Sequence, residues 1–440
     1  MDNKKNTFQI VLMAIFGVGI VIGAILFATT KSSDSGPGAG GRITIWGTLD
    51  SDVFYTAAGG VADQLGDVEI VYQRYDESVF ENTFVNALAS GGGPDLIVIE
   101  GQDVLTQRAR LTPWSYEVFP QSSFAENFVD SAQIFLLNDG VYAFPLLIDP
   151  LVLYSNKDLL TSGFFVNAPE TWNDVLDYVP SLVEKTDAGS IIRSGIAMGT
   201  GRNIAHAVDI FSALTLQSQN PIIQRLPQQN DFDPEFAAVL RSPGFGGQQN
   251  PAANSLIFYA SFADKTQAHY SWNASLDLDR DAFVAGDTAM YIGYASEYTD
   301  LITRNPNLNF GVSLLPQIKD NPTRATFAHV YGLGVVRTTQ QPALAQAVAN
   351  TIGTMGSEIF SNTFGMPSPR RDVLSKRADQ DVFQVFNNSA IIARSWFNPL
   401  PEQVDELIRQ AIVDVNAGRE QPTQIITTLE DRMNDFLRRK

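Results

Sequence analysis

Apolar and polar residues alternate in two short segments early in the chain. Residues 42–47 read RITIWG and residues 68–72 read VEIVY, and this two-residue period is typical of β-strands. Residues 95–99 read DLIVI, an almost continuous apolar run of the kind found in buried parallel strands. Helical patterns, one reaching about residue 65 and one at residues 80–89, separate the three strands. This order of elements predicts an α/β fold with a parallel sheet.

The last third of the chain is patterned for helices. Apolar residues recur every three or four positions over residues 342–355, 404–415 and 425–437. Such stripes predict helices that each bury one face against a core. We expect these helices to contribute packing and no chemistry.

The longest apolar run lies at the N-terminus. Residues 8–28 contain Gln9 as the only clearly polar residue, and a helix of this length spans the ~30 Å hydrocarbon core of a membrane. Lys4 and Lys5 precede the run, which predicts a cytoplasmic N-terminus at residues 1–7 and a chain that otherwise lies outside.

A cleaved signal peptide is the alternative interpretation of this run. Its apolar part is shorter and ends at small residues of the A-x-A type, whereas residues 27–31 read FATTK. We therefore expect an uncleaved transmembrane anchor at residues 8–28, followed at residues 29–41 by a flexible Gly/Ser/Pro linker.

Composition narrows the range of functions. The 440 residues are 44% hydrophobic and 18% charged, which predicts a globular protein of two or more domains. The net charge of -18 argues against a nucleic-acid partner. The chain has no cysteine, and its three histidines are not spaced for zinc. It also has neither a Walker A loop nor a GxSxG elbow, so we expect no cofactor and no metal.

Six blocks of residues, in order, resemble the extracellular solute-binding proteins of ABC importers, in the branch that includes maltose- and other oligosaccharide-binding proteins. The blocks are ASGGGPDL at 89–96, DGVYAFP at 139–145, LYSNKDLL at 153–160, APETWNDV at 168–175, FVAGDTAM at 283–290 and LLP at 314–316. The resemblance covers about residues 42–440. The lipid-modified cysteine common in this family is missing, which is consistent with the predicted anchor.

The resemblance implies a two-lobed fold of the type II periplasmic-binding-protein class, in which a multi-strand hinge joins the lobes and the ligand binds between them. The implied ranges are 42–147 and 334–368 for lobe one, 149–332 and 370–440 for lobe two, and 145–151, 332–336 and 365–371 for the crossings between them.

For function, the resemblance implies a monomeric receptor that is not an enzyme and that delivers a ligand, with carbohydrate as the leading class, to ABC permease subunits in the membrane. Three alternatives stay open. The ligand is another solute, and an acidic site would suit a cation; the protein is a sensor; or it is a surface carbohydrate-active enzyme, since carboxylates are plentiful.

Candidate ligand-binding residues follow from the rule that such sheets bind ligands at the carboxyl ends of their strands. Trp46 ends the first strand, and Gln102 and Asp103 follow the third. Asp149 is a charged residue in the otherwise apolar first crossing, where it needs a partner. Tyr294 follows the strand after which the family presents an aromatic residue to the ligand.

Four further candidates complete the set. Glu297 shares the segment of Tyr294, Tyr331 abuts the second crossing, Arg370 follows the third, and Trp396 precedes the last helices. Aromatic rings and charged or amide groups are what sugar sites combine. Two neighbours of these residues, Glu100 and His329, are secondary candidates.

Overall fold

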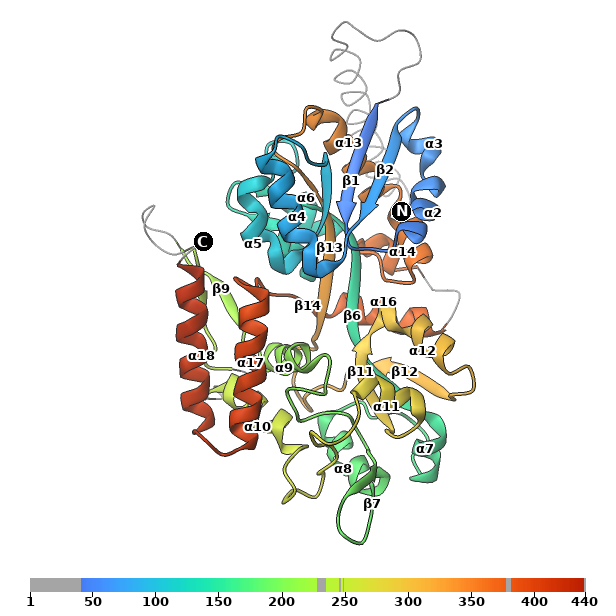
Figure 1. Ribbon diagram of the computed structural model, residues 1–440, viewed down its shortest axis with the longest axis vertical. Helices are drawn as coiled ribbons and strands as arrows, with labels where there is room; N and C mark the ends of the chain where they lie inside the picture. The colour runs from blue at the N-terminus through green and yellow to red at the C-terminus, as the bar shows by residue number, and fades with distance from the viewer. Residues whose placement is uncertain (1–40, 228–234, 245–246, 248, 377–380, 439–440) are drawn as a thin grey trace, which may run out of the picture.

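The computed structural model describes residues 41–227, 235–244, 247, 249–376 and 381–438, which form two lobes along the long axis of the molecule (Figure 1). The predicted anchor and nearly all of the predicted linker lie outside the described residues. None of the helices in the described part has the length and apolar character needed to cross a membrane.

Lobe one, uppermost in Figure 1, is built around parallel strands. Its elements are β1 (Arg42–Gly47), α2 (Ser51–Gly60), α3 (Ala62–Leu65), β2 (Glu69–Arg74), α4 (Glu77–Ala89), β3 (Leu96–Glu100), α5 (Val104–Gln107), α6 (Gln121–Asn127), β4 (Leu136–Leu137), β5 (Gly140–Val141), α13 (Pro342–Thr354) and α14 (Ser357–Phe364), with 3-10 turns at Gly101–Asp103 (η1), Arg108–Arg110 (η2) and Asp130–Phe135 (η3).

Lobe two is larger and more helical. Its elements are α7 (Lys157–Ser162), α8 (Trp172–Leu182), β7 (Glu184–Lys185), β8 (Ile191–Arg193), α9 (Ala207–Gln217), β9 (Ile223–Arg225), β10 (Phe236–Ala238), α10 (Pro251–Ser261), α11 (Asp279–Ala285), β11 (Met290–Tyr294), the 3-10 turn η5 (Ala295–Glu297), α12 (Tyr298–Arg304), β12 (Phe310–Leu314), α16 (Asp381–Ile391), β14 (Ala393–Arg394), α17 (Pro401–Asn416) and α18 (Pro422–Leu437).

Two long strands, β6 (Phe144–Asn156) and β13 (Thr326–Val335), pass from one lobe into the other (Figure 1). They unite both lobes in one eight-stranded sheet with the order β11-β6-β13-β3-β1-β2, to which β12 adds on β6 and β14 on β13. A third connection lies beside them, because the amide of Ile148 donates to the carbonyl of Pro367 at 2.9 Å. Beyond it, α15 (Arg371–Leu374) opens the final segment. The exact limits of the lobes remain a prediction.

The strand and helix predictions are confirmed, with shifts of no more than three residues at element ends. The first strand is β1 and the third is β3, and β1 pairs in parallel with β2 and β3 as expected. The sheet as a whole is mixed, because β3 pairs with β13 in antiparallel fashion. The three C-terminal stripes are α13, α17 and α18. Their apolar faces are buried, as Ile352, Ile412 and Met433 show at 0% exposure.

The blocks that carry the family resemblance have local physical roles. Asn156 caps α7, because its side chain accepts from the amides of Asp158 and Leu159 at 3.0 and 3.1 Å. Thr171 forms a capping box with Asp174 at the start of α8. Gly140 has φ 155°, and a β-carbon there would lie 2.4 Å from the carbonyl oxygen of Trp114. In these three blocks, the named residues therefore fix the ends of elements.

Candidate ligand-binding site

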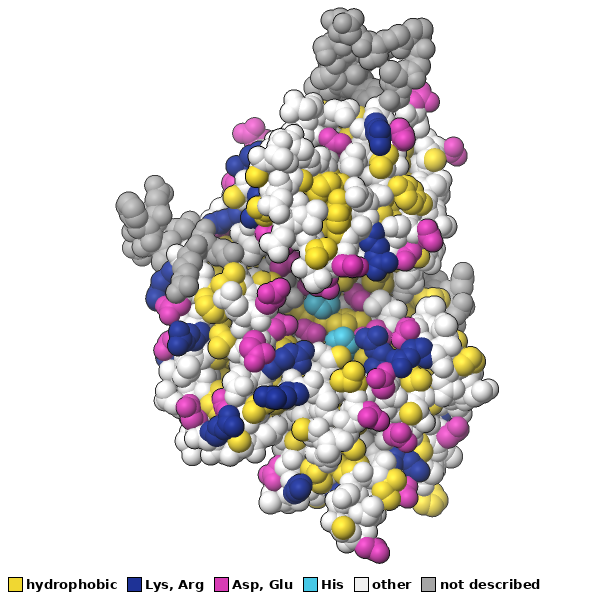
Figure 2. Space-filling view, in the orientation of Figure 1, with side chains coloured by type: hydrophobic (Ala, Val, Ile, Leu, Met, Phe, Trp, Pro, Cys, Tyr) yellow, Lys and Arg dark blue, Asp and Glu magenta, His cyan; other side chains and the backbone are white. Residues whose placement is uncertain are grey.

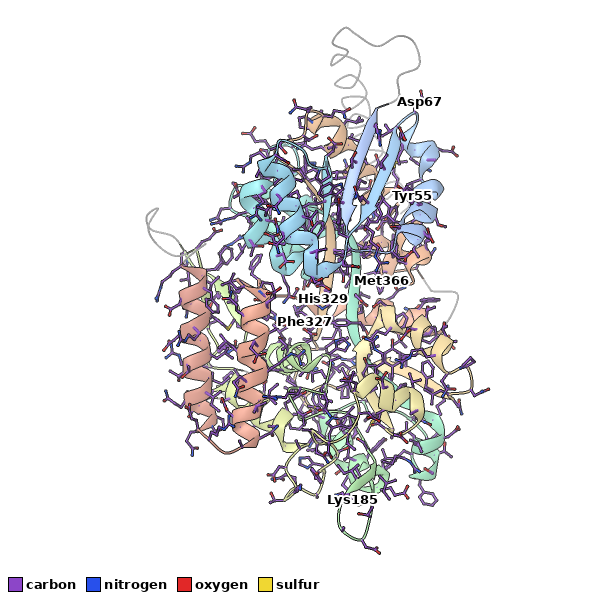
Figure 3. The ribbon with its side chains drawn as sticks, in the orientation of Figure 1. Tyr55, Asp67, Lys185, Phe327, His329 and Met366 are labelled. Atoms are coloured by element: carbon purple, nitrogen blue, oxygen red, sulfur yellow. The ribbon has the colours of Figure 1, made fainter. Side chains whose placement is uncertain are left out.

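The register of the crossing strands gathers polar side chains on one face of the sheet. His329 on β13 lies directly opposite Asp149 on β6, and Tyr331, two residues further on, lies opposite Glu100 at the end of β3. Side chains two apart on a strand, and those directly opposite across strands, share a face. Asp149, His329, Tyr331 and Glu100 therefore face the same side where the strands pass between the lobes. Figure 3 shows His329 at this level.

His329 and Glu100 form an ion pair between Nδ1 and Oε1. Burial opposes protonation of His329, but Glu100, Asp209 and Asp149 outweigh it and raise the pKa of the imidazole to about 9. Both side chains keep about a fifth of their surface exposed, 20% for His329 and 18% for Glu100. The imidazole is thus protonated at neutral pH, and both side chains are open to a solute.

Aromatic and charged side chains of lobe two pack against this ion pair. The ring of Tyr294, the last residue of β11, lies 4.6 Å from the ring of His329 and 4.7 Å from that of His206. His206 precedes α9 and bonds Glu297 through Nε2 at 2.5 Å, while its Nδ1 lies 3.6 Å from Asp209. Burial disfavours the imidazolium, but Asp209 and Glu297 raise the pKa of His206 to about 10.

The carboxylate of Glu297 has several hydrogen-bond and ion-pair partners within the protein. Its carboxylate accepts from the hydroxyl of Tyr291 at 2.5 Å, pairs with Arg280 at 3.1 Å, and accepts from the amide of Tyr294 at 3.3 Å, besides its bond to His206. These contacts occupy both carboxylate oxygens. We interpret Glu297 as the residue that positions His206, rather than as a ligand contact.

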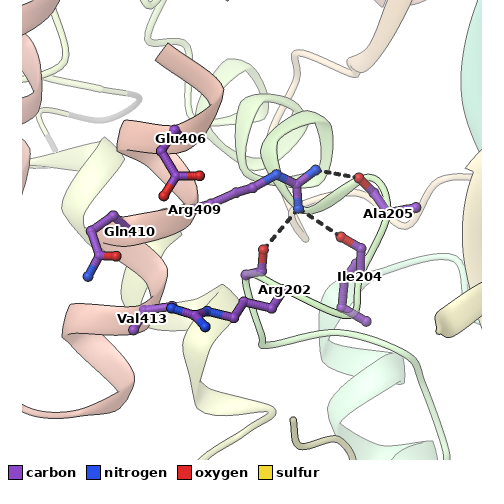
Figure 4. Close-up of a pocket in the computed structure, with 8 residues that line it drawn as sticks. Arg202, Ile204, Ala205, Glu406, Arg409, Gln410 and Val413 are labelled. Atoms are coloured by element: carbon purple, nitrogen blue, oxygen red, sulfur yellow. Dashed lines mark hydrogen bonds between the residues drawn. The ribbon is translucent and has the colours of Figure 1, made fainter. Parts of the chain in front are cut away.

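The loop before His206 is fixed by Arg409 from α17. The guanidinium donates to the carbonyls of Gly201, Ile204 and Ala205 at 2.9, 3.0 and 2.7 Å (Figure 4). A groove of about 400 Å³ opens beside this contact, lined on α17 by Glu406, Arg409, Gln410 and Val413. Because the guanidinium already donates to three carbonyls of the loop, we interpret Arg409 as a residue that holds this loop in place.

Lobe one contacts the segment before α17 next to these side chains. The amide of Asn398 donates to the carbonyl of Gln102 at 3.1 Å, and the Asn398 side chain lies 3.4 Å from Asp405 on α17. Burial raises the pKa of Asp103 to about 8, reinforced by Glu100, and His329 acts on the same carboxyl in the opposite direction. The lobes thus touch where acidic groups converge.

We call these side chains the interlobe cluster, which comprises Glu100, Gln102, Asp103, Asp149, His206, Asp209, Tyr294, Glu297, His329, Tyr331, Asn398 and Asp405. Figure 2 shows the surface hollowed between the lobes, with histidine and acidic side chains gathered there. The interlobe cluster includes six of the nine candidates from the sequence: Gln102, Asp103, Asp149, Tyr294, Glu297 and Tyr331.

The other three candidates make their contacts with residues outside the cluster. Trp46 is aligned with Ile97 rather than Glu100, which puts it on the opposite face of the sheet, where its ring lies 4.8 Å from that of Tyr75. Arg370 pairs with Asp372 at 2.8 Å. Trp396 is 3% exposed and donates its indole N–H to Ser212 at 3.2 Å, which are the features of a core residue.

Sequence reasoning missed His206, Asp209, Asp405 and Asn398, and it ranked Glu100 and His329 second. His206 immediately precedes α9, Asp209 lies in its first turn, and Asp405 lies within α17, so no strand end marks them. Tertiary packing alone brings these segments together. The rarity of histidine, with three in the chain, was the one available signal.

Comparison with known proteins gives a coherent picture. A family model described as bacterial extracellular solute-binding protein matches residues 55–357. No curated protein matches the sequence.

Solved structures share the fold at low sequence identity. A cyclic α-maltosyl-1,6-maltose-binding protein from Arthrobacter globiformis superposes with a TM-score of 0.73 at 17% identity, covering 91% of this chain and 100% of the other. The sugar-binding protein MalE from Xanthomonas citri gives 0.71 at 16% identity, covering 90% and 98%. An ABC transporter solute-binding protein from Thermotoga lettingae, bound with α-D-tagatose, gives 0.66 at 20% identity, covering 90% and 100%.

Proposed function

Because the chain belongs to the bacterial extracellular solute-binding proteins, we propose that it captures a carbohydrate between its two lobes and delivers it to an ABC permease. The family consists of binding proteins, so the chain is a binding protein and not an enzyme. The solved structures it resembles bind tagatose and maltose-based sugars, according to their descriptions, and this similarity suggests the ligand class.

One observation carries the proposal. Rings and hydrogen-bonding groups from both lobes meet at the crossing strands, where Tyr294 and Tyr331 adjoin the exposed edges of Glu100 and His329. Aromatic faces match the C–H faces of sugar rings, and charged groups bond the hydroxyls. A solute bound there would link the lobes and favour their closed arrangement.

Calorimetry of the full-length chain against mono- and oligosaccharides tests the ligand class. We expect binding to at least one saccharide, and Glu100→Gln should weaken it at least tenfold. Glu69→Gln, on the exposed side of β2 in the same lobe, is the matched control and should leave the affinity unchanged. Binding that is equal in both variants would contradict a site at the interlobe cluster.

We also propose that residues 8–28 hold the receptor in the membrane with its lobes outside, as a monomer. The uninterrupted apolar run after Lys4 and Lys5 supports this proposal. Cell fractionation tests it: the full chain should sediment with membranes, and a chain that lacks residues 1–30 should not. Release of a shortened chain from wild-type cells would instead support a cleaved signal peptide.

A further inference from the structure

The imidazole of His329 is held in one orientation by three neighbours. Its Nδ1 atom is hydrogen-bonded to Oε1 of Glu100 at the end of β3. Its ring packs on that of Tyr294 on β11, with centroids 4.6 Å apart, and lies edge to face with that of Phe327 on β13 at 5.4 Å (Figure 3). Because these contacts come from three different strands, they fix which nitrogen of the ring faces Glu100.

The other nitrogen of this ring, Nε2, is available to a solute. It forms no hydrogen bond with any described residue and is not sealed within the protein. The side chain is 20% exposed, and Figure 2 shows histidine in the hollow between the lobes. His206 differs, because Glu297 and Asp209 lie against its two nitrogens. Of the two histidines in the interlobe cluster, His329 is thus the one with a nitrogen to offer a ligand.

The hydrogen bond to Glu100 decides which proton His329 loses. A carboxylate accepts hydrogen bonds and cannot donate them, and a neutral imidazole carries one N–H. Nδ1 therefore keeps its hydrogen, and the proton that leaves the imidazolium is the one on Nε2. Below the pKa of His329, the nitrogen that a solute reaches is a donor, and above it the same nitrogen is an acceptor.

The surroundings of His329 favour the donor form at neutral pH. Burial disfavours the imidazolium, but the carboxylates of Glu100, Asp209 and Asp149 outweigh it and raise the pKa of His329 to about 9. The groups that act on this ring from neighbouring elements are carboxyls and one phenol: Glu100 on β3, Asp103 on η1, Asp149 on β6, Asp209 on α9, Tyr294 on β11 and Asp405 on α17. His329 is therefore a cationic donor among acceptors.

We propose that His329 determines the specificity of this site: its Nε2–H donates a hydrogen bond to an uncharged oxygen of the bound saccharide, and Glu100 is the positioning residue that keeps Nε2 a donor. The inference rests on the proposed carbohydrate function and adds the polarity of one contact. The imidazolium disfavours an ammonium group at this position, and the surrounding carboxylates disfavour an anionic one. A hydroxyl or ring oxygen satisfies both conditions.

Proton linkage tests the inference by calorimetry of the full-length chain. The panel comprises tagatose, maltose, maltotriose, cellobiose and lactose, and the tightest-binding member serves as the probe. Titration in buffers of different ionisation enthalpy measures proton uptake on binding, which should be about half a proton at pH 9 and near zero at pH 6. The affinity should fall about fourfold between pH 8 and pH 9.5, because the protonated fraction of His329 falls by that factor.

Three variants assign the effect to its residues. His329→Gln keeps a neutral donor but has no proton to lose, so the proton uptake and the fall in affinity should both disappear. Asp103→Asn removes a neighbouring carboxyl group, whose pKa burial raises to about 8, and should keep the uptake at pH 9. Glu100→Gln should move the midpoint of the pH profile below 9, because it removes the charge that contributes most to the raised pKa of His329.

Thermal denaturation at each pH controls for folding of all three variants. Saccharide binding without proton uptake at pH 9, or uptake that persists in His329→Gln, overturns the inference and leaves the carbohydrate receptor intact. An unchanged midpoint in Glu100→Gln overturns the positioning role of Glu100. The absence of binding by every saccharide at pH 7 overturns the proposed function and the inference with it.

Discussion

Two groups of charged side chains meet at the interlobe cluster, and they differ in how the protein compensates them. In the lobe-two network of His206, Asp209, Arg280 and Glu297, each charge has an opposite charge within 3.6 Å. Although burial acts to raise the pKa of Asp209 and Glu297, the contact with His206 keeps both pKa values low. Among the described residues, neither Asp103 nor Asp405 forms a close ion pair. Burial raises both pKa values, and the more distant Arg409 and His329 offset this only in part.

The difference distinguishes charged residues that stabilise the fold from charged residues that are available to a ligand. A charge that the protein itself neutralises stabilises a local arrangement, here the orientation of His206. A charge that the protein leaves uncompensated makes the unliganded molecule less stable, and a ligand of opposite charge recovers that free energy. We therefore expect the strongly perturbed carboxyl groups to lie in the part of the cluster that faces the solute.

The largest expected effect comes from breaking the compensated group. Glu297→Ala leaves His206 and Arg280 without their shared buried partner, so we expect a loss of about 3–5 kcal/mol in the free energy of unfolding. Chemical denaturation measures it. Asp300→Ala removes an exposed carboxylate 3.8 Å from the same Arg280 and should cost less than about 1 kcal/mol. Equal costs for the two variants would remove the distinction between the groups.

Stability of the unliganded protein should fall as the pH rises from 6 to 9. His329 has a folded pKa of about 9, above its ordinary value, so its contribution is complete below about pH 6.5 and is lost as the pH rises through 9. Asp103 favours folding only while protonated, because its folded pKa is about 8 against an ordinary 3.8. Each of these groups changes the free energy of unfolding by about 1.4 kcal/mol per pH unit, so we expect a decrease of roughly 4–6 kcal/mol over this range, measured by denaturation at each pH.

Asp209 and Glu297 determine how stability is lost at acid pH. Their pKa values are lowered in the folded protein, so their contribution is present above about pH 4 and is lost as the pH falls further. Asp103 costs stability from about pH 4 upward, so the profile should have its maximum near pH 4–5. A maximum at pH 8 or above would contradict the assignment of the uncompensated group.

Asp103→Asn should stabilise the unliganded protein by about 1–2 kcal/mol at pH 8 and flatten the alkaline decrease. The reason is that the variant removes a half-buried carboxyl group whose ionisation is disfavoured by burial and by Glu100. Thermal denaturation with and without ligand measures both the stability of the unliganded variant and any loss of stabilisation by the ligand. Destabilisation at pH 8 with unchanged ligand affinity would mean that Asp103 is a structural residue.

The smallest expected effect lies at the rim of the lobes. Arg108 on η2 pairs with Glu235 next to β10 at 2.8 Å, and both side chains are partly exposed. Arg108→Ala should therefore cost less than about 1 kcal/mol in stability, yet it should favour a more open arrangement by small-angle scattering. Arg304→Ala, which breaks a pair within lobe two, is the control and should leave the scattering profile unchanged.

Much of the fold was predictable because it depends on local patterns. The two-residue period of β1, the buried run of β3 and the apolar stripes of α13, α17 and α18 each mark one element. The crossing strands entered through the family resemblance, and β6 and β13 do pass between the lobes. None of these inferences needed the relative placement of distant segments.

The candidate site was only partly predictable, since it depends on such placement. Asp149 was identifiable because a charge in an apolar crossing needs a partner. Trp46 satisfied the strand-end rule, yet the register places it on the opposite face from Glu100. Asp405 was hidden in a regular helical pattern, where its position beside Asn398 arises from the packing of α17.

A crystal structure of the full-length chain with its tightest-binding saccharide tests the central claim most directly. Our account predicts the saccharide at the interlobe cluster, within hydrogen-bond distance of Glu100 and His329 and with both lobes in contact. A saccharide bound in the groove beside Arg409, or on the surface of one lobe alone, would contradict it.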